Sequence, residues 1–383
     1  MKRVMLLFFA LTMSCTALFF SPVRAEEMSL AQNCKAVYLC DAKSGQTVYA
    51  RNETTHLPIA SMCKIMTLLL SFEAEEDGKI SFEDEVCISE RAAGMGGSQV
   101  FLEAGGKYLV KDLIESICIA SANDSCVAMA ETVCGSEELF VKKMNERAEE
   151  LGMKDTSFSD CTGLPKEGQY SCARDVAVML RELLKKEKYY SFSKIWMDEM
   201  HHSGGRVTQM ANTNKLIRNY QGCDSGKTGY TSEAGFCLAA SAARGEMRVV
   251  SVVIGAPDSK TRFEGVCEMF DYAFANFTSR CVLEDKVLQD AKCEVKGGKQ
   301  REISVIPARP CYLFANKGEE DKIEIEICMD GVKAPVAVGD RVGEAVIFKN
   351  GVESDRIPLL ANENSKKNGY FDCIRDLAEN WTI

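Results

Sequence analysis

Strand-like segments lie at both ends of the first two thirds of the chain, with helix-like segments between them. Residues 36–50 and 236–255 each contain two short apolar strands around a glycine-bearing turn, which is typical of a β-hairpin. Residues 83–200 mainly have helical spacing, and a further helical segment follows at about 261–277. This order predicts an α+β fold in which one antiparallel sheet, formed by both ends of the segment, packs against helices.

The pattern changes after about residue 282. Short strands with glycine-bearing turns are predicted at 299–306, 322–329 and 345–348, which indicates a small separate all-β domain. The tail, 363–383, returns to helical spacing and predicts a C-terminal amphipathic helix. Its apolar stripe consists of Tyr370, Phe371, Ile374, Leu377 and Trp381.

The N-terminus has the layout of a secretory signal peptide. Two basic residues precede an apolar run to about residue 20, and small Val23 and Ala25 stand before a predicted cut after Ala25. An uncleaved membrane anchor is the alternative, and a lipoprotein through Cys15 is weaker. The predicted organisation is therefore a signal peptide at 1–25, a catalytic domain at 26–280, a β domain at 281–362 and the tail helix at 363–383. We expect the protein to be secreted and to lie outside the cytoplasm.

The amino-acid composition disfavours several classes of function. The net charge of −10 argues against a nucleic-acid partner. The chain has only 3 histidines, 18 cysteines and no CxxC pair, which disfavours a zinc enzyme or a Ser-His-Asp hydrolase. We expect no metal and no organic cofactor. Since many cysteines lie in apolar runs, we expect most of them to be buried free thiols.

The first candidate motif is Ser61-Met62-Cys63-Lys64, near the start of an apolar helix predicted at 59–74. Residues three apart share a helix face, so Lys64 can reach the Ser61 hydroxyl. A serine needs a base to become a nucleophile, and a lysine can act as that base when its pKa is lowered. The pattern alone is weak, because Ser191-Phe192-Ser193-Lys194 also matches it.

The second candidate is Ser121-Ala122-Asn123, at the end of a helical run. In a turn, the two polar side chains can face one cleft, where Ser121 can relay a proton and Asn123 can bind an amide. The alternative is an ordinary helix-breaking cluster, because Asp124 follows.

The third candidate is Lys227-Thr228-Gly229, just before a predicted strand. A lysine and a hydroxyl on a sheet edge can bind a carboxylate, and a glycine allows a substrate backbone to approach. Lys43-Ser44-Gly45 is similar, but it lies in a hairpin turn that needs no function.

Together and in this order, the three motifs resemble the SxxK, SxN and KTG set of penicillin-binding proteins and serine β-lactamases. Four longer segments, 58–67, 162–165, 170–175 and 227–241, resemble the low-molecular-weight D-alanyl-D-alanine carboxypeptidases. The resemblance runs from about residue 30 to the C-terminus. It implies a β-lactamase/transpeptidase-like domain and removal of the terminal D-alanine from peptidoglycan stem pentapeptides, with β-lactam antibiotics as covalent inhibitors.

The resemblance also implies roles for individual residues. Ser61 would be the acylated nucleophile, Lys64 its base, and Ser121 and Asn123 would line the cleft from the helical side. Lys227, Thr228 and Gly229 would bind the substrate's terminal carboxylate from the strand. Backbone N–H groups of Ser61 and Tyr230 would form the oxyanion hole. Arg262 matches an arginine that helps to bind that carboxylate, and a surface salt bridge is its alternative role.

Two departures stand near these motifs. Asp224-Ser225-Gly226 precedes Lys227 where the family has Asp-Gly and an aliphatic residue, so we expect Gly226 to loosen the strand edge. Cys63 lies inside the first motif, and we expect it to be a packed helix residue. In the family the tail helix lies on the outer face of the cytoplasmic membrane, which the aromatic stripe fits. A helix docked on the β domain is the alternative.

Two other functions remain open from the sequence. A β-lactamase is disfavoured because no Glu-x-x-Leu-Asn segment follows Asn123 and because a β domain is appended. A catalytically silent wall-binding protein is disfavoured because all motif residues are present.

Overall fold

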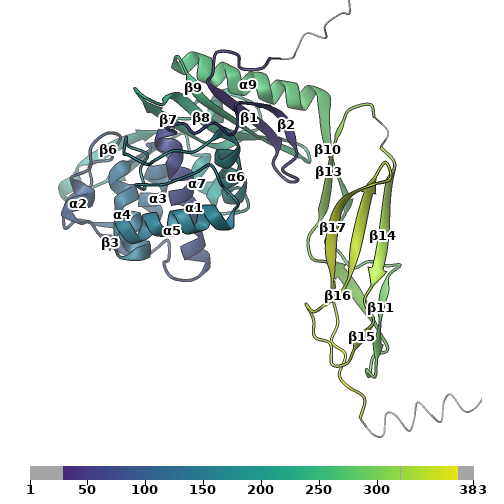
Figure 1. Ribbon diagram of the computed structural model, residues 1–383. Coiled ribbons are helices and arrows are strands. Elements are labelled where there is room, and N and C mark those ends of the chain that lie inside the picture. The colour runs from purple at the N-terminus through teal and green to yellow at the C-terminus, as the bar shows by residue number, and fades with distance from the viewer. Residues whose placement is uncertain (1–28, 320, 370–383) are drawn as a thin grey trace, which may run out of the picture. The chain divides into compact units, whose positions relative to one another are not determined.

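The computed structural model describes residues 29–319 and 321–369. In the first domain, five strands form an antiparallel sheet in the order β2-β1-β9-β8-β7 (Figure 1). The strands are β1 (Ala36–Asp41), β2 (Thr47–Arg51), β7 (Cys223–Thr231), β8 (Gly235–Arg244) and β9 (Met247–Ala256). The predicted α+β sheet, built from both ends of the segment, is confirmed, and β7 forms one of its edges.

Helices cover both faces of this sheet. Helix α9 (Ser259–Asn276) packs on β8 and β9, and α6 (Ala173–Leu183) packs on β1 and β9 from the other side (Figure 1). Strand β1 is buried at every position and β9 at nearly every position. This is why both strands are mainly apolar and show no regular polar alternation.

The helical region lies between β2 and β7. Its central helix, α1 (Lys64–Glu76), is buried along most of its length and begins as a short 3-10 turn, η1 (Ala60–Cys63). Helix α6 and the helices α3 (Val110–Ile119), α4 (Asn123–Cys134) and α5 (Glu137–Glu150) contact it. The region also contains α2 (Glu90–Ala93), α7 (Tyr189–Ser193), η2 (Ser203–Gly205) and α8 (Leu216–Asn219).

Two small two-stranded antiparallel sheets also lie among the helices, where the sequence predicted mainly helix. They are β3 (Glu85–Cys87) with β4 (Lys107–Leu109), and β5 (Met197–His201) with β6 (Val207–Ala211). Strands of three to five residues are too short to produce a clear alternating pattern.

The second domain is all β, as predicted. Strands β10 (Phe277–Leu283) and β13 (Cys311–Asn316) pair with each other. A six-stranded sheet has the order β14-β16-β17-β12-β11-β15. Its strands are β11 (Lys292–Lys296), β12 (Glu302–Pro307), β14 (Ile323–Met329), β15 (Val332–Lys333), β16 (Arg341–Lys349) and β17 (Val352–Ala361).

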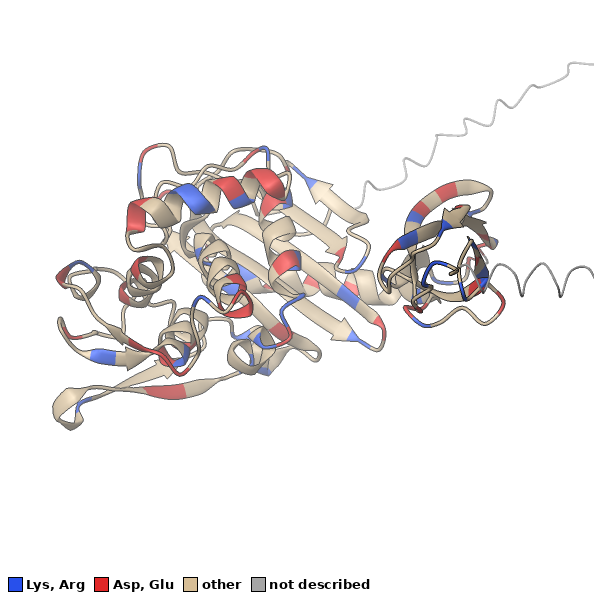
Figure 2. Ribbon diagram, turned by 90° about the horizontal axis from the view of Figure 1, so that it is seen from below, with Lys and Arg blue, Asp and Glu red and all other residues tan. Residues whose placement is uncertain are grey.

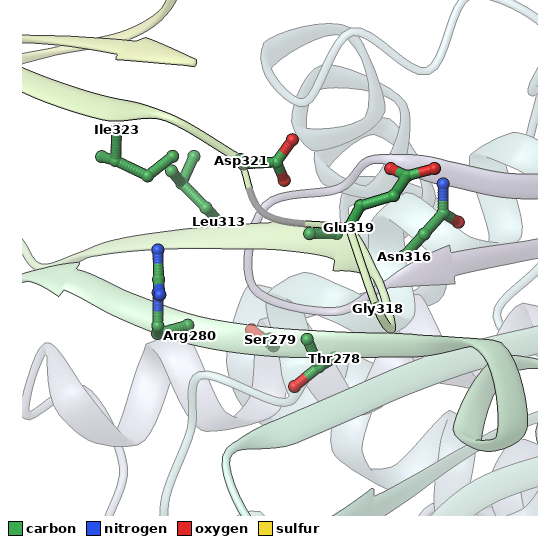
Figure 3. Close-up of a pocket in the computed structure, with 10 residues that line it drawn as sticks. Thr278, Ser279, Arg280, Leu313, Asn316, Gly318, Glu319, Asp321 and Ile323 are labelled. Atoms are coloured by element: carbon green, nitrogen blue, oxygen red, sulfur yellow. The ribbon is translucent and has the colours of Figure 1, made fainter. Parts of the chain in front are cut away.

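This domain contains a hollow of about 580 Å³ between β10, β13 and the start of β14 (Figure 3). Arg280 and Asp321 belong to its lining, together with Ser279, whose buried hydroxyl has no hydrogen-bond partner among the described residues. None of the residues predicted from the three motifs lines it.

The predicted tail helix is wrong for its first residues. Ser365 exchanges backbone hydrogen bonds with Val336, and Lys367 forms an isolated bridge with Gly298. The buried Ser365 hydroxyl also donates to the carbonyl of Gln300 at 2.7 Å. Residues 365–369 are therefore extended, because the β domain pairs with their backbone. The apolar stripe at 370–383 and the signal peptide at 1–25 lie outside the described residues.

The sixteen cysteines among the described residues are free thiols, and eleven of them are buried. Most are therefore buried, as expected, although Cys87 and Cys328 are exposed. Basic and acidic positions are interspersed over the helices and strands (Figure 2). Among the described residues, no helix combines the length and the apolar character needed to cross a membrane.

Candidate active site

Ser61 and Lys64 are in direct contact at the start of α1. Lys64 is fully buried, and its Nζ donates to Ser61 Oγ at 2.8 Å and to the carbonyl oxygen of Thr162 at 2.6 Å. Ala60, just before the serine, has a positive φ of 47°, which is a strained conformation for a residue with a side chain. The strained turn leaves Ser61 partly exposed above the buried amine.

A loop at 160–170 holds the second partner of Lys64. Asp160 Oδ1 accepts hydrogen bonds from the backbone N–H groups of Thr162 at 2.5 Å and Gly163 at 2.6 Å. Gly163 has a φ of +84°, and a Cβ there would lie 2.0 Å from the carbonyl oxygen of Ala60. Only glycine fits at this contact. The sequence had marked 162–165 by resemblance, but it assigned no role to Asp160 or Gly163.

Ser121 and Asn123 lie where α3 gives way to α4, as a turn rather than a helix. Ser121 has a φ of 63°, and its Oγ accepts a hydrogen bond from Lys227 Nζ at 2.7 Å. Asn123 begins α4, and its Nδ2 donates to the carbonyl of Gly96 at 2.7 Å. Buried Asp124 accepts from the backbone N–H groups of Val100 and Leu102, both at 3.1 Å. The polar residues that follow α3 therefore end that helix and also hold the loop at residues 96–102 through hydrogen bonds.

Lys227 is a second buried amine opposite the first. Burial, together with the smaller effect of the nearby charge of Lys64, lowers its pKa to about 7. Its hydrogen bond to Ser121 joins the β7 edge of the sheet to the helical region. The three motifs therefore meet as two serine–lysine pairs, Ser61 with Lys64 and Ser121 with Lys227.

The edge strand β7 lies directly against the turn that carries Ser61. A Cβ on Gly229 would lie 2.8 Å from the carbonyl oxygen of Ile59 and 3.2 Å from the Ser61 backbone nitrogen. The glycine therefore permits this approach. Thr228 Oγ1 donates to Thr213 Oγ1 at 2.8 Å, and the Tyr230 ring packs on Phe236 with a centroid distance of 4.4 Å. Tyr230 itself is 56% exposed.

Arg262 reaches this edge from α9. Its Nη1 donates to the carbonyl oxygens of Gly229 and Cys237, each at 3.3 Å, and its Nη2 donates to Ser259 Oγ at 3.2 Å. The side chain is only 7% exposed, and burial lowers its pKa to about 10. Its Nε has no hydrogen-bond partner among the described residues. A surface salt bridge is therefore not its role, since it is buried and pairs with no described carboxylate.

The two departures from the family pattern have structural explanations. Gly226 has a φ of +142°, and a Cβ there would lie 2.5 Å from the carbonyl oxygen of Ala239. Strand β7 nevertheless stays paired with β8 from Ser225 to Thr231, so the expected loosening is absent from the strand pairing. Cys63 is buried, as expected, and its Sγ donates to the carbonyl of Asp160 at 3.4 Å. Burial raises the pKa of this thiol well above its usual value.

One group of potential metal ligands is present among the described residues, at Asp155, Cys172 and Asp175. The potential ligand atoms of this group already accept hydrogen bonds from the protein. Asp155 Oδ2 accepts from Arg174 at 2.7 Å, and Asp175 Oδ2 accepts from the Asp155 backbone N–H at 2.9 Å. Cys172 Sγ accepts from the Asp175 backbone N–H as the cap of α6. The group is a structural network around a helix N-terminus.

Comparisons with known proteins agree with this geometry. Residues 23–258 match a family model described as D-alanyl-D-alanine carboxypeptidase, and residues 278–367 match one described as penicillin-binding protein 5, C-terminal domain. The D-alanyl-D-alanine carboxypeptidase DacF of Bacillus subtilis is 43% identical over 355 residues, which are 92% of this chain and 91% of DacF. DacD of Escherichia coli is 30% identical and covers 88% of each chain.

Solved structures agree in fold. Penicillin-binding protein 5 of Haemophilus influenzae matches with a TM-score of 0.73 and 28% identity, covering 89% of this chain and 99% of that one. A peptidoglycan synthesis regulatory factor of Streptococcus pneumoniae matches with a TM-score of 0.71 and 25% identity, covering 88% and 100%. With the family model matching most of the first domain and relatives matching nearly the whole length, the chain belongs to the D-alanyl-D-alanine carboxypeptidase family.

Proposed function

We propose that the protein is a serine DD-carboxypeptidase that removes the terminal D-alanine from peptidoglycan stem pentapeptides through an acyl-enzyme on Ser61. Family membership supports the reaction. One observation carries the assignment of the nucleophile: Ser61 Oγ is partly exposed and lies 2.8 Å from the Nζ of fully buried Lys64. A hydroxyl held against a buried amine is the arrangement that serine activation by lysine requires.

In the first step, Lys64 Nζ accepts the Ser61 proton while Ser61 Oγ bonds to the penultimate D-alanine's carbonyl carbon. The Ser61 and Tyr230 N–H groups hold the resulting oxyanion. The carbon–nitrogen bond then breaks, and the departing D-alanine amine receives a proton through Ser121 from Lys227. The pKa of Lys227, about 7, allows this amine both to give and to take up a proton near neutral pH.

In the second step, water adds to the acyl carbon and gives a proton to the active-site amines. The ester bond to Ser61 breaks, and the serine oxygen takes a proton back. Asn123 orients the acyl part of the substrate from the helical side during both steps. The chemistry uses only side chains and water, so no cofactor enters the proposal.

The substrate's terminal carboxylate is held at the β7 edge by Thr228 and by the positive charges of Lys227 and Arg262. The surroundings of Arg262 support its part in binding the carboxylate, because the guanidinium is buried and has no carboxylate partner among the described residues. A buried cation of this kind is stabilised by an incoming anion. β-Lactams, which carry a carboxylate beside a reactive amide, are expected to acylate Ser61 in the same pose.

The location of the protein remains part of the proposal. We infer a secreted enzyme outside the cytoplasm, with the signal peptide at 1–25 removed and peripheral membrane contact through the aromatic stripe at 370–383. Both inferences rest on the sequence. Fractionation of cells that express the full chain or a chain ending at Asn368 tests the membrane contact. Release of only the shortened chain from membranes is expected, and equal distribution of the two would contradict the anchor.

The function is tested by intact mass and peptide mapping of residues 26–383 after benzylpenicillin, beside Ser61→Ala. A stable adduct on the Ser61 peptide, absent from the variant, is expected, followed by D-alanine release from a stem pentapeptide. No adduct with the drug intact would favour a silent wall-binding protein. No adduct with the drug consumed would favour a β-lactamase.

A further inference from the structure

Four exposed lysines gather at one end of the β domain. Lys296 ends β11 and Lys333 ends β15, and these two strands pair side by side in parallel. Lys366 and Lys367 lie on the extended segment after β17, whose backbone pairs with residues 297–299. In Figure 1, β11 and β15 lie at the end of the domain where the described chain stops. We call Lys296, Lys333, Lys366 and Lys367 the lysine patch.

The lysine patch brings like charges together. Lys296 and Lys333 are direct partners in the parallel pairing, and the Lys299 N–H donates to the carbonyl of Lys366 at 2.8 Å. Like charges opposite each other on neighbouring strands repel and destabilise the pairing. The fold therefore carries a cost at this end that a bound anion would remove.

The chain itself gives the lysine patch no described counter-ion. Lys292, on the same strand as Lys296, pairs with Glu302 at 3.4 Å. By contrast, none of the four patch lysines forms an ion pair within residues 29–319 and 321–369. Glu294 lies two positions before Lys296 on the same face of β11, yet the two are not paired. The positive charge of the patch is therefore available to an outside partner.

The lysine patch is a surface rather than a hollow. All four side chains are exposed, and Val338, on the loop before β16, is 57% exposed. The Val338 N–H donates to Asn364 Oδ1 at 2.9 Å, two positions before Lys366. A lysine ammonium is a point charge on a flexible stem. Several of them on an open surface therefore suit a layer of anions better than one shaped ligand.

The segment that follows the patch has the opposite charge. Residues 370–383 contain one basic residue, Arg375, against three acids, Asp372, Asp376 and Glu379. The segment is net negative, so an anionic membrane would repel it. Any electrostatic attraction that supports the membrane contact proposed for this segment therefore comes from other residues.

The lysine patch lies within range of a membrane that residues 370–383 touch. Residue 370 is three positions after Lys367, and three residues of chain span at most about 11 Å. Exposed charges act over about 10 Å at an ionic strength of about 0.1 M. A bilayer surface that meets the start of the segment is therefore within range of these lysines.

We infer that the lysine patch is a docking surface for anionic lipid headgroups, which holds this end of the β domain against an anionic bilayer beside residues 370–383. The ammonium groups would pair with lipid phosphates, and this would relieve the repulsion between Lys296 and Lys333. The inference rests on the proposed function, because the membrane contact of 370–383 is part of it.

Binding of residues 26–383 to lipid vesicles tests the lysine patch. One vesicle is pure phosphatidylcholine, and in the other about a third of the lipid is phosphatidylglycerol, which is anionic. Sedimentation gives the ratio of the two affinities, anionic to neutral. Each lysine near an anionic surface contributes about 5-fold in affinity. We expect Lys296→Gln/Lys333→Gln and Lys366→Gln/Lys367→Gln each to reduce the ratio by about 5- to 25-fold at low salt.

Two further variants are the controls. Lys296→Arg/Lys333→Arg keeps the charge and should keep the ratio. Lys154→Gln/Lys215→Gln removes the same charge from exposed positions of the first domain and should leave the ratio unchanged. High salt should bring the ratio of the wild type toward 1, because the attraction is screened. Benzylpenicillin acylation and the melting temperature, measured on every variant, report whether the protein is folded.

The outcomes separate this inference from the proposed function. If the wild type binds both vesicles equally, the lysine patch is wrong while the membrane contact of 370–383 stands. If the wild type binds neither vesicle, that contact fails too, and D-alanine release decides the carboxypeptidase separately. An equal fall in the first-domain variant would mean that overall charge governs binding, and would overturn the patch.

A soluble anionic polymer is the competing partner. If polyglycerol phosphate binds the wild type as tightly as the anionic vesicles do, and loses binding in the same two patch variants, the lipid assignment is overturned. A ratio that falls in both glutamine variants of the patch, but not in the arginine variant or the first-domain variant, supports the lipid surface.

Discussion

Lys227 Nζ lies 2.7 Å from Ser121 Oγ, although the two residues are 106 positions apart in the chain. This hydrogen bond crosses from the edge strand of the sheet to the turn between α3 and α4. Both groups are buried, so the bond forms where water competes little for either partner. It closes one side of the site whose other side is the Ser61–Lys64 pair.

Lys227 should make the stability of the protein depend on pH. Its pKa is about 7 in the fold and ordinarily 10.5, so between these values the unfolded chain binds more protons. The free energy of unfolding therefore rises with pH across this window, by at most about 1.4 kcal/mol per pH unit for one proton. We expect the wild type to gain stability relative to Lys227→Met between pH 7 and 9 in urea titrations. A constant difference between the two proteins would contradict the lowered pKa.

Gly163→Ala should disturb the nucleophile. The new Cβ would lie 2.0 Å from the carbonyl oxygen of Ala60, so the turn before Ser61 must shift. We expect benzylpenicillin acylation to slow by at least about 10-fold, because a small displacement of a reacting group has a large effect on rate. Stopped acylation reactions analysed by intact mass measure this.

Gly168→Ala is the matched control for that prediction. Gly168 lies in the same loop with a similar φ of +78°, but the nearest atom to its added Cβ is Ser159 Oγ at 3.4 Å. The backbone strain is the same and the collision is absent. We expect a comparable loss of thermal stability and nearly normal acylation. Equal slowing in both variants would mean that loop strain, and not the contact with Ala60, governs the site.

Asp160→Ala should displace the loop that holds Lys64. The change leaves the buried N–H groups of Thr162 and Gly163 without their acceptor, and each unsatisfied group costs about 1–3 kcal/mol. The carbonyl that bonds Lys64 would lose its fixed place. We expect lower kcat with a lower melting temperature. Asp77→Ala removes an exposed ion pair to Lys79 and should leave both quantities close to the wild type.

The thiols should react according to their burial. Cys87 and Cys328 are exposed, whereas Cys63 and Cys126 are fully buried and burial raises the pKa of both. A brief alkylation of the native protein should label the first two, and the second two should react only after denaturation. Peptide mapping gives the labelled positions. Rapid native labelling of Cys63 would show that the Ser61 turn opens to solvent.

The sequence alone determined the features that depend on neighbouring residues. The three-residue spacing of Ser61 and Lys64 implied their contact, because a helix turn brings such residues onto one face. The two glycine-bearing hairpins and the separate β domain also followed from local alternation and turn residues. These patterns repeat within a few residues, so no long-range information is needed to interpret them.

Tertiary structure decided the contacts between distant segments. The Asp160 loop that holds Lys64, the contact of Gly163 with Ala60 and the conformation of Gly226 depend on backbones that pack closely from far along the chain. Residues 365–369 have a helical pattern, yet they are extended because Val336 and Gly298 offer backbone partners. Helix propensity differs by only a few tenths of a kcal/mol per residue, roughly, so backbone hydrogen bonds to a folded domain outweigh it.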